Sequence, residues 1–346
     1  MGKTYFTLGA DEAPEAWRAI RSMRAAPTPS LRKVLKQERA EVFHMALEQS
    51  QQQFAAAAGI GYESRPLNLF YGLSQAGRAL AAASSRLGPK EGDDRTAWLP
   101  RGGHGLKFDV DTPTVERLLG EPVRLQAGKS DTFSRVSHAL GSPLDFREET
   151  FGALLAQIPE VYLEFRTFEY GPVAIQPNGI YAGSPLHFPL RWDLEARGAP
   201  IESGDLTALR EWVNSYPALA GLALEVDAEG KRIPSHNDGH LYLTVSSQDQ
   251  LVLRGSQWLP AQSIEYRRST ALFPRLGNSS TAAHPIVIWW MVLFALSMLA
   301  RYSPRDWSRL MSLRESRLAS VLEHVLDTAL DAVPNLIAEA LADLNP

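Results

Sequence analysis

The most apolar stretch of the chain is Pro285–Ala300, where Ser297 is the only polar side chain before Arg301 closes the run. A membrane-spanning helix needs about 20 apolar residues, so this stretch is short for a span. A helix that is apolar on every side is typical of the centre of a large protein core. The pattern therefore predicts a fully buried central helix.

A second apolar stretch, Pro66–Ser84, differs from the first because it is rich in small residues, among them Gly72, Ala76 and Gly77. A glycine inside a helix costs about 1 kcal/mol relative to alanine. Two such glycines therefore indicate close packing against another helix. We expect the bulky face of Pro285–Ala300 to be the partner.

Apolar residues at helical spacing predict further helices at both ends of the chain. Asp11–Met23 is expected to form a first helix, and Leu31–Ala58 one long helix or two in succession. Near the other end, Pro304 is expected to begin a short helix, because proline is tolerated in a first helical turn.

The last part of the chain carries a broad stripe of Leu and Val side chains that begins at Leu313 and reaches Leu330. This stripe predicts a helix with one buried face. Pro334-Asn335 is expected to interrupt it before a final helix over Leu336–Leu344, because proline disfavours a helix interior.

The middle of the chain mixes polar, turn-forming and β-rich segments. Gly204–Tyr216 is expected to form a helix. His240–Val245 and Leu251–Leu253 are β-rich runs separated by Ser246–Gln250, which predicts a hairpin, and Ser263–Thr270 is a candidate edge strand.

These patterns predict an α+β protein, predominantly α, in which a helical bundle formed by the N- and C-terminal segments carries a mixed α/β central insertion. The expected parts are residues 1–98, 99–283 and 284–346, with the first and last in one helical core. The length of 346 residues allows two domains, or one domain with a large insertion.

Composition excludes several classes of site and partner. The absence of cysteine excludes disulfides, thiolate metal sites and a cysteine nucleophile. The net charge of -4 gives no general attraction to nucleic acid or to anionic membranes. The first residues lack the apolar stretch of a signal peptide. We therefore expect a cytoplasmic protein with no membrane partner, and the sequence indicates neither a cofactor nor a metal site.

Four segments resemble the YaaC-like family of bacterial proteins. They are Arg65–Leu80, the pair His104-Gly105, Ala153–Val161 and Leu293–Leu310. The resemblance spans most of the chain and implies a bacterial cytoplasmic protein of the predicted fold, without implying an activity. The family often has a basic run after its His-Gly pair, whereas only Lys107 follows here, so phosphate contacts from such a run are not expected.

Arg317 and His324, with six residues between them, are the candidate catalytic pair. Seven positions are about two helical turns, so both side chains should project from one face of a helix. The spacing loosely resembles the Arg and His of HEPN-type ribonucleases, in which His transfers a proton and Arg stabilises the phosphate. A solvated polar face explains the same residues without catalysis.

Three residues in two parts of the chain are candidate anion-binding residues. Arg301 follows the central helix, where a cation complements the helix dipole or holds a bound anion. Arg101 and His104 lie in a glycine-rich loop, whose backbone can approach a phosphate closely. A plain connecting loop is the competing interpretation.

The segment Arg18–Arg39 contains seven basic residues and only Glu38 as an acid. It includes Arg32, Lys33 and Lys36, which are the candidate phosphate contacts of a nucleic-acid surface. Aromatic residues for base stacking are absent between Ile20 and Ala40.

Packing signals outnumber catalytic signals in this sequence. We therefore favour a non-catalytic binding or assembly protein, with nucleic acid or another protein as partner and a homodimer as a possible assembly. The alternative is a HEPN-like ribonuclease or other nucleic-acid-directed effector that uses Arg317 and His324.

Overall fold

The computed structural model describes residues 13–88, 98–100, 102–110, 114–126, 130–161, 171–177, 180–181, 186–188, 190–195, 198–200, 205–226, 230 and 240–345. Within these residues the architecture is α+β and predominantly helical, which confirms the predicted fold class. The strands that pair do so in antiparallel fashion.

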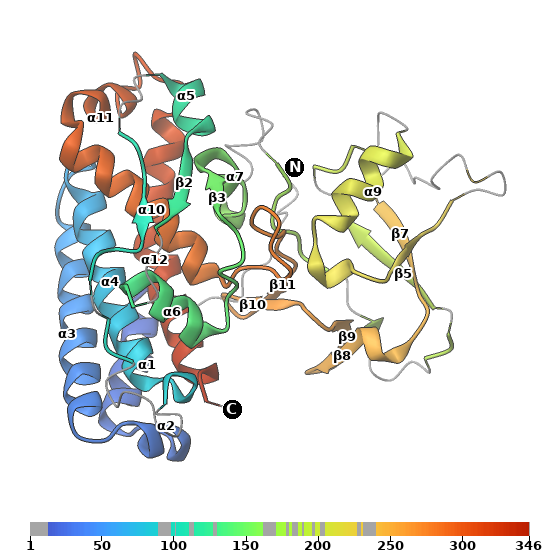
Figure 1. Ribbon diagram of the computed structural model, residues 1–346, viewed down its shortest axis with the longest axis horizontal. Coiled ribbons are helices and arrows are strands. Elements are labelled where there is room, and N and C mark those ends of the chain that lie inside the picture. Colours follow the sequence, from blue (N-terminus) through green and yellow to red (C-terminus); the bar gives the residue numbers. More distant parts are fainter. Residues whose placement is uncertain are drawn as a thin grey trace.

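The two ends of the chain contribute neighbouring helices to one core. They are α1 (Ala13–Ala25), α2 (Pro29–Val34), α3 (Glu38–Ala58), α4 (Arg65–Ala83), α10 (Pro285–Tyr302), α11 (Pro304–Leu310) and α12 (Ala319–Asp343). Figure 1 shows the blue N-terminal helices beside the orange and red C-terminal ones. Helix α4 packs against α3, α10 and α12, while α1 packs against α12.

Helix α10 lies in the middle of this core. Among the described residues it is the helix long and apolar enough to cross a membrane, but 78% of that window is buried inside the protein. Its side chains from Pro285 to Ser297 are all buried. The prediction of a buried central helix is therefore confirmed.

The small residues of α4 make close contacts on two sides. A Cβ atom at Gly77 would lie 2.6 Å from Trp290 Cη2, which is too close to the indole ring of this α10 side chain for van der Waals contact. This confirms that α4 and α10 approach closely. A Cβ atom at Gly72 would instead lie 2.7 Å from Phe54 Cδ2 of α3. The prediction that Gly72 also faces Pro285–Ala300 is wrong, because α4 is packed on both sides.

Helix α12 runs without a break through Pro334, so the predicted interruption at Pro334-Asn335 is wrong. An internal proline costs a helix about 3 kcal/mol or more. The buried stripe continues on both sides of it, through Val333 and Leu336. Burial of each such side chain contributes about 1.5–3 kcal/mol, and this burial outweighs the cost of the proline.

The start of that stripe also differs from the prediction. Leu313 lies in the turn before α12 and is 69% exposed, so the buried stripe begins at Leu318. In the N-terminal part, Leu31–Ala58 forms two helices, α2 and α3, and Gln37 between them has a positive φ of 47°.

The central region contains short elements. Its helices are α5 (Val115–Gly120), α6 (Thr132–Leu140), α7 (Phe151–Ala156) and α9 (Leu206–Asn214), with 3-10 turns η1 (Ser85–Leu87), η2 (Pro159–Val161), η4 (Pro217–Leu219) and η5 (Gln248–Gln250). Its strands are β1 (Leu106–Lys107), β2 (Pro122–Leu125), β3 (Glu148–Thr150), β4 (Ile180–Tyr181), β5 (Leu190–Glu195), β6 (Ala223–Leu224), β7 (His240–Val245), β8 (Leu251–Arg254), β9 (Gln257–Pro260), β10 (Ile264–Tyr266) and β11 (Ser269–Ala271).

These strands form small sheets with the orders β1-β2-β3, β5-β7-β6, β4-β9-β8 and β10-β11. The predicted hairpin of His240–Val245 with Leu251–Leu253 is wrong, because β7 and β8 belong to different sheets. Strand β7 pairs with β5 and β6, and β8 pairs with β9. Both edges of β7 are occupied by strands that precede it by many residues, and local sequence patterns do not report such pairing.

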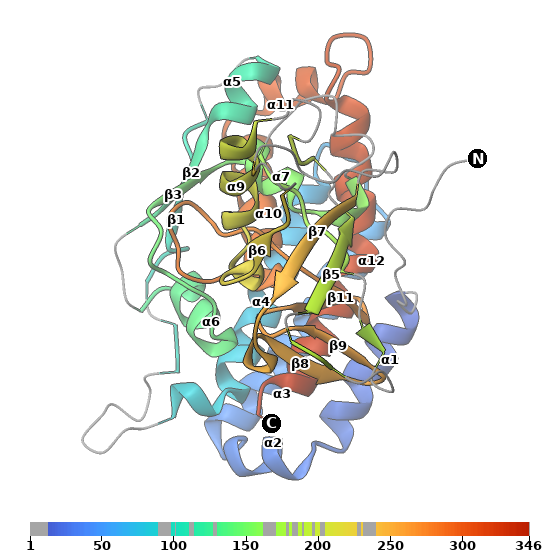
Figure 2. The same cartoon turned by 90° about the vertical axis from the view of Figure 1, so that its right-hand side faces the viewer.

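The sheets β5-β7-β6 and β4-β9-β8 lie beside the helical part, with α9 packed near them, on the right of Figure 1. Figure 2 looks at this side and shows β5, β7, β8 and β9 in front of the helices. The hairpin β10-β11 lies between these sheets and α12 (Figure 1). The predicted edge strand Ser263–Thr270 is therefore a hairpin held against the helical part.

Candidate functional site

Three segments that are far apart in the sequence meet where α10 ends. Arg301 lies in the last turn of α10, His104 lies in the loop before β1, and Tyr71 lies on α4. Arg301 Nη1 donates a hydrogen bond of 3.3 Å to Tyr71 Oη. The His104 ring centroid is 5.3 Å from that of Phe70 on α4. The structure thus brings together two candidate binding residues, Arg301 and His104, that are separated in the sequence by slightly more than the length of the central region.

The charge state of His104 follows from this packing. Partial burial against Phe70 and Phe294, and secondarily the positive charge of Arg301, lowers the pKa of His104 below its ordinary value. His104 is therefore neutral near pH 7 and can donate one hydrogen bond while accepting another. Arg301 is the permanent cation of the pair.

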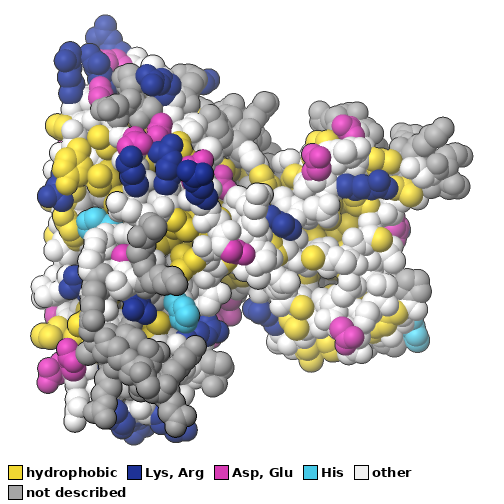
Figure 3. Space-filling view, in the orientation of Figure 1, with side chains coloured by type: hydrophobic (Ala, Val, Ile, Leu, Met, Phe, Trp, Pro, Cys, Tyr) yellow, Lys and Arg dark blue, Asp and Glu magenta, His cyan; other side chains and the backbone are white. Residues whose placement is uncertain are grey.

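Two tyrosines complete this surface, which we call the Arg301 surface and define as Tyr71, His104, Arg301 and Tyr302. Tyr71 is 40% exposed and Tyr302 is 54% exposed. The Arg301 guanidinium lies 5.0 Å from the centroid of the Tyr302 ring. In Figure 3 hydrophobic side chains gather on the left edge of the helical part, below Lys and Arg side chains near the top. A cation beside exposed rings suits a ligand with both a phosphate and a planar ring.

The glycine-rich loop leaves its backbone open beside His104. Among the described residues, no atom lies within 4 Å of the Cβ positions of Gly102 and Gly103. Gly105, in contrast, has a φ of 79°, and a Cβ atom there would collide with the Asp131 carboxylate that caps α6. Packing therefore requires the glycine at 105, whereas the space beside 102 and 103 is available to a ligand. Arg101 lies outside the described residues.

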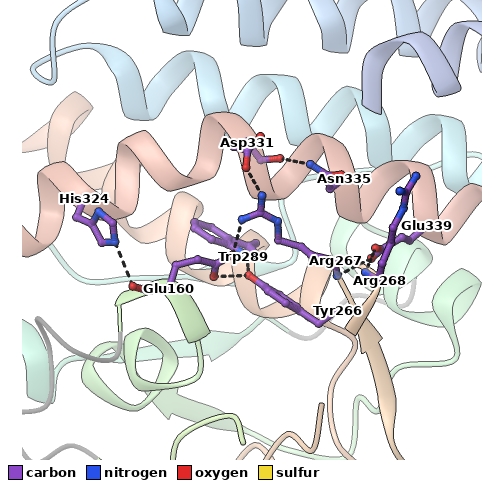
Figure 4. Close-up of polar contacts among 9 residues, drawn as sticks. All are labelled: Glu160, Tyr266, Arg267, Arg268, Trp289, His324, Asp331, Asn335 and Glu339. Carbon is purple, nitrogen blue, oxygen red and sulfur yellow. Dashed lines mark hydrogen bonds and ion pairs between the residues drawn. The ribbon is translucent and has the colours of Figure 1, made fainter. Parts of the chain in front are cut away.

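The candidate catalytic pair is not on one helix. Arg317 is an exposed residue of the turn before α12, which begins at Ala319, so the prediction that both residues share a helix is wrong. His324 lies on α12, and its Nε2 is 3.1 Å from the backbone carbonyl oxygen of Glu160 (Figure 4). The contact requires Nε2 to carry its proton, which leaves Nδ1 for any proton transfer.

The basic residues of the N-terminal segment lie on three helices and, for Lys36, in the connection between α2 and α3. Arg32 donates through Nε to the carbonyl of Pro27, and Lys33 and Lys36 are exposed. Arg39 is buried and donates to the carbonyls of Ala82 and Ser84 at the end of α4. Figure 1 places α2 at the opposite end of the helical part from α11. The structure therefore does not bring Arg32, Lys33 and Lys36 near the Arg301 surface.

A polar network that sequence patterns did not indicate holds the β10-β11 hairpin to the core (Figure 4). Arg267, which is 7% exposed, donates to Glu160 Oε1 at 2.9 Å and forms an ion pair with Asp331 of α12. Tyr266 Oη donates to Glu160 Oε2 at 2.7 Å and accepts from Trp289 Nε1 at 3.3 Å. No local sequence pattern around the adjacent Arg267 and Arg268 indicated that this network would form.

The turn of this hairpin is strained and is held by one carboxylate. Arg267 and Arg268 both have positive φ, 48° and 59°, which costs energy for residues other than glycine. Glu339 of α12 accepts the backbone N–H groups of both, at 3.0 Å and 2.6 Å. Burial, with smaller contributions from Glu265 and Asp343, raises the pKa of Glu339 to about 7 despite these bonds.

The raised pKa of Glu339 predicts a pH-dependent stability. The folded state holds this proton more tightly than the unfolded state, so the contribution of Glu339 to the free energy of unfolding falls as pH rises towards and through about 7. Glu339→Gln cannot titrate, so its free energy of unfolding should decrease less between about pH 5.5 and about pH 8. Urea unfolding across this range measures the difference. Glu323→Gln on the same helix is the control, and equal pH slopes for all three proteins would contradict the prediction.

Comparison with known proteins identifies the family of this chain and gives no more specific function. The family model described as YaaC-like Protein matches residues 22–341, which include α3, α4, the central region, α10 and α11. Neither the curated proteins nor the solved structures contain a match to this chain.

Proposed function

This chain belongs to the YaaC-like protein family, and from that premise we propose that it is a non-catalytic binding protein of the bacterial cytoplasm whose partner is single-stranded nucleic acid. The proposed contact is the Arg301 surface. The observation that carries the proposal is the meeting of Arg301, His104 and two exposed tyrosines from three distant segments.

The chemistry of this surface matches single strands better than duplexes. A guanidinium binds phosphate oxygens through directed, charge-assisted hydrogen bonds. Stacking of a base on an aromatic side chain contributes about 1–3 kcal/mol and needs an unpaired base. Tyr71 and Tyr302 are both exposed, and each contacts Arg301. Neutral His104 and the open backbone at Gly102 and Gly103 supply further hydrogen-bonding groups.

The ribonuclease alternative is less favoured because Arg317 and His324 lie on different structural elements. Arg317 lies before the helix that carries His324, and one nitrogen of His324 is already engaged by the Glu160 carbonyl. An acid–base catalyst must exchange its proton with the substrate. Because the Nε2 proton of His324 is engaged in a hydrogen bond to the η2 turn, His324 is a weaker candidate for that role.

Fluorescence anisotropy with a short labelled oligouridylate at low salt tests the proposal. Arg301→Ala should weaken binding about tenfold, because a charge-assisted bond contributes about 1.5–3 kcal/mol. Tyr302→Ala should weaken it by a similar factor through lost stacking. Arg210→Ala is the matched control, since this exposed arginine of α9 lies outside the Arg301 surface.

Three outcomes of this assay decide against the proposal. Wild type that does not bind the oligonucleotide at low salt would overturn it. Equal affinity for Arg301→Ala and wild type would also overturn it. Cleavage of the oligonucleotide by wild type, lost in Arg317→Ala and His324→Ala, would replace it with the ribonuclease alternative.

A further inference from the structure

A cavity of about 250 Å³ lies away from the Arg301 surface, between the β10-β11 hairpin and the last turns of α12. The lining also includes Arg86 of η1, Leu140 at the end of α6 and His284 directly before α10. Glu339, the carboxylate that holds the strained turn, forms part of its wall. Residues from both chain ends and from the central region therefore surround one small space.

One buried polar group in this wall has no hydrogen-bond partner among the described residues. It is the hydroxyl of Ser263, a residue that is 4% exposed. The backbone carbonyl of Ser263 is already used, because it accepts from Arg254 Nη2 at 2.9 Å. Leaving a buried hydroxyl unpaired costs about 1–3 kcal/mol. The hydroxyl oxygen itself is shielded from solvent. The side chains that distinguish the cavity from a simple packing defect are the charged ones that line it.

Two basic residues, Arg86 and His284, lie near one another in the wall of the cavity. The guanidinium of Arg86 lies against Gly141, where a Cβ atom would be 3.0 Å from Arg86 Cζ, and it donates to the carbonyl of Ala139. Burial, and secondarily the charge of Arg86, lowers the pKa of His284 to about 4, so His284 is neutral. Its Nδ1 accepts the backbone N–H of Ile286 at the start of α10. The remaining nitrogen, Nε2, therefore carries the proton and can donate to an anion.

Carboxylates and a second arginine, Arg254, form another part of the lining. Glu339 lies close enough to Glu265 and Asp343 for their charges to raise its pKa, in addition to the larger effect of burial. All three residues line the cavity. Within the described residues no group of three or more acidic or histidine side chains is arranged to hold a metal ion. A single ammonium group would relieve the repulsion among these carboxylates without requiring metal coordination geometry.

We propose that this cavity binds a small zwitterion of the α-amino acid class. The carboxylate of the ligand is held by Arg86 and His284, and its ammonium group is held by Glu265, Glu339 and Asp343. The apolar walls supplied by Leu140 and Leu344 accommodate a short side chain. The volume suits a small metabolite, since sites for drug-sized ligands are about 300–1,000 Å³. This proposal is independent of nucleic-acid binding at the Arg301 surface.

Isothermal titration calorimetry with the standard L-α-amino acids as probes tests the proposal. At least one should bind to wild type, and its N-acetyl and carboxamide derivatives, which each lack one charge, should bind at least tenfold more weakly. Arg86→Gln and Glu265→Gln should each weaken binding about tenfold, equivalent to about 1.4 kcal/mol. Both side chains belong to exposed residues, so these variants are expected to fold.

Arg210→Gln is the control for loss of a positive charge, because it lies on α9 and does not line this cavity. The proposal is overturned if no amino acid binds to wild type. It is equally overturned if the derivatives bind as tightly as the parent amino acid, or if Arg86→Gln binds as tightly as Arg210→Gln. Arg301→Ala should retain amino acid binding, which separates this result from the outcome at the Arg301 surface.

Discussion

Arg267→Ala is expected to lower the free energy of unfolding by about 3–5 kcal/mol, as removal of one partner from a buried ion pair generally does. The side chain of Glu160 is only 10% exposed, and without Arg267 its remaining described side-chain partner is the Tyr266 hydroxyl. Asp331 loses its ion pair as well. The large effect therefore comes from a carboxylate left in the core, and not from the arginine side chain itself.

Arg268→Ala is the matched control for this prediction. Arg268 has the same sign of φ in the same turn but is exposed, so both substitutions place alanine in an equally unfavourable backbone region. We expect Arg268→Ala to change the free energy of unfolding by no more than about 1 kcal/mol. The double variant Glu160→Gln with Arg267→Met should recover part of the loss, because it removes both charges. Urea unfolding measures all of these, and equal effects of the two alanine substitutions would refute the argument.

Gly77→Ala should destabilise the protein by about 2 kcal/mol, although alanine favours helix by about 1 kcal/mol relative to glycine. The added methyl group would lie 2.6 Å from Trp290 Cη2 and 2.7 Å from Val136 Cγ2, both in fully packed surroundings. Either α4 and α10 must separate or the indole must leave its position. Overpacking of this kind generally costs about 1–3 kcal/mol.

Gly120→Ala is the control for helix propensity, because this glycine ends α5 and no atom of the described residues lies within 4 Å of its Cβ position. It should be neutral or slightly stabilising in the same urea titration. Trp290→Leu should reduce the penalty of Gly77→Ala in the double variant, since it removes the ring that the new methyl group would meet. Additive effects of the two substitutions would show that Gly77 is not constrained by Trp290.

Several features of the fold were predictable because they depend on neighbouring residues along the chain. The continuous apolar run predicted the burial of α10, and the small residues of α4 predicted the contact at Gly77. Predictions failed where contacts between distant parts of the chain outweigh the conformational preference of the local sequence. Helix α12 continues through Pro334 because its buried face does, and β7 pairs with β5 and β6 instead of forming the hairpin with β8.

The candidate sites likewise contain residues that the sequence identified and contacts that it did not. Arg301 and His104 were each identifiable from the sequence, one as a cation at a helix end and the other in a glycine-rich loop. Their proximity was not identifiable, because it depends on the packing of α4 against α10. Arg267, Glu160 and Glu339 had no local pattern to mark them, since isolated charged residues in strands and helices are usually exposed.

The sequence by itself determined the α+β class and the identity of the buried central helix, because periodicity and composition act within one element at a time. The family followed from the resemblance of four sequence segments. Only the tertiary structure decided which polar groups share a surface or a cavity. Such groups meet when elements far apart in the chain pack together, and the energy of that packing comes mainly from apolar contacts. The Arg301 surface and the cavity at Ser263 are consequences of how the core around α10 is assembled.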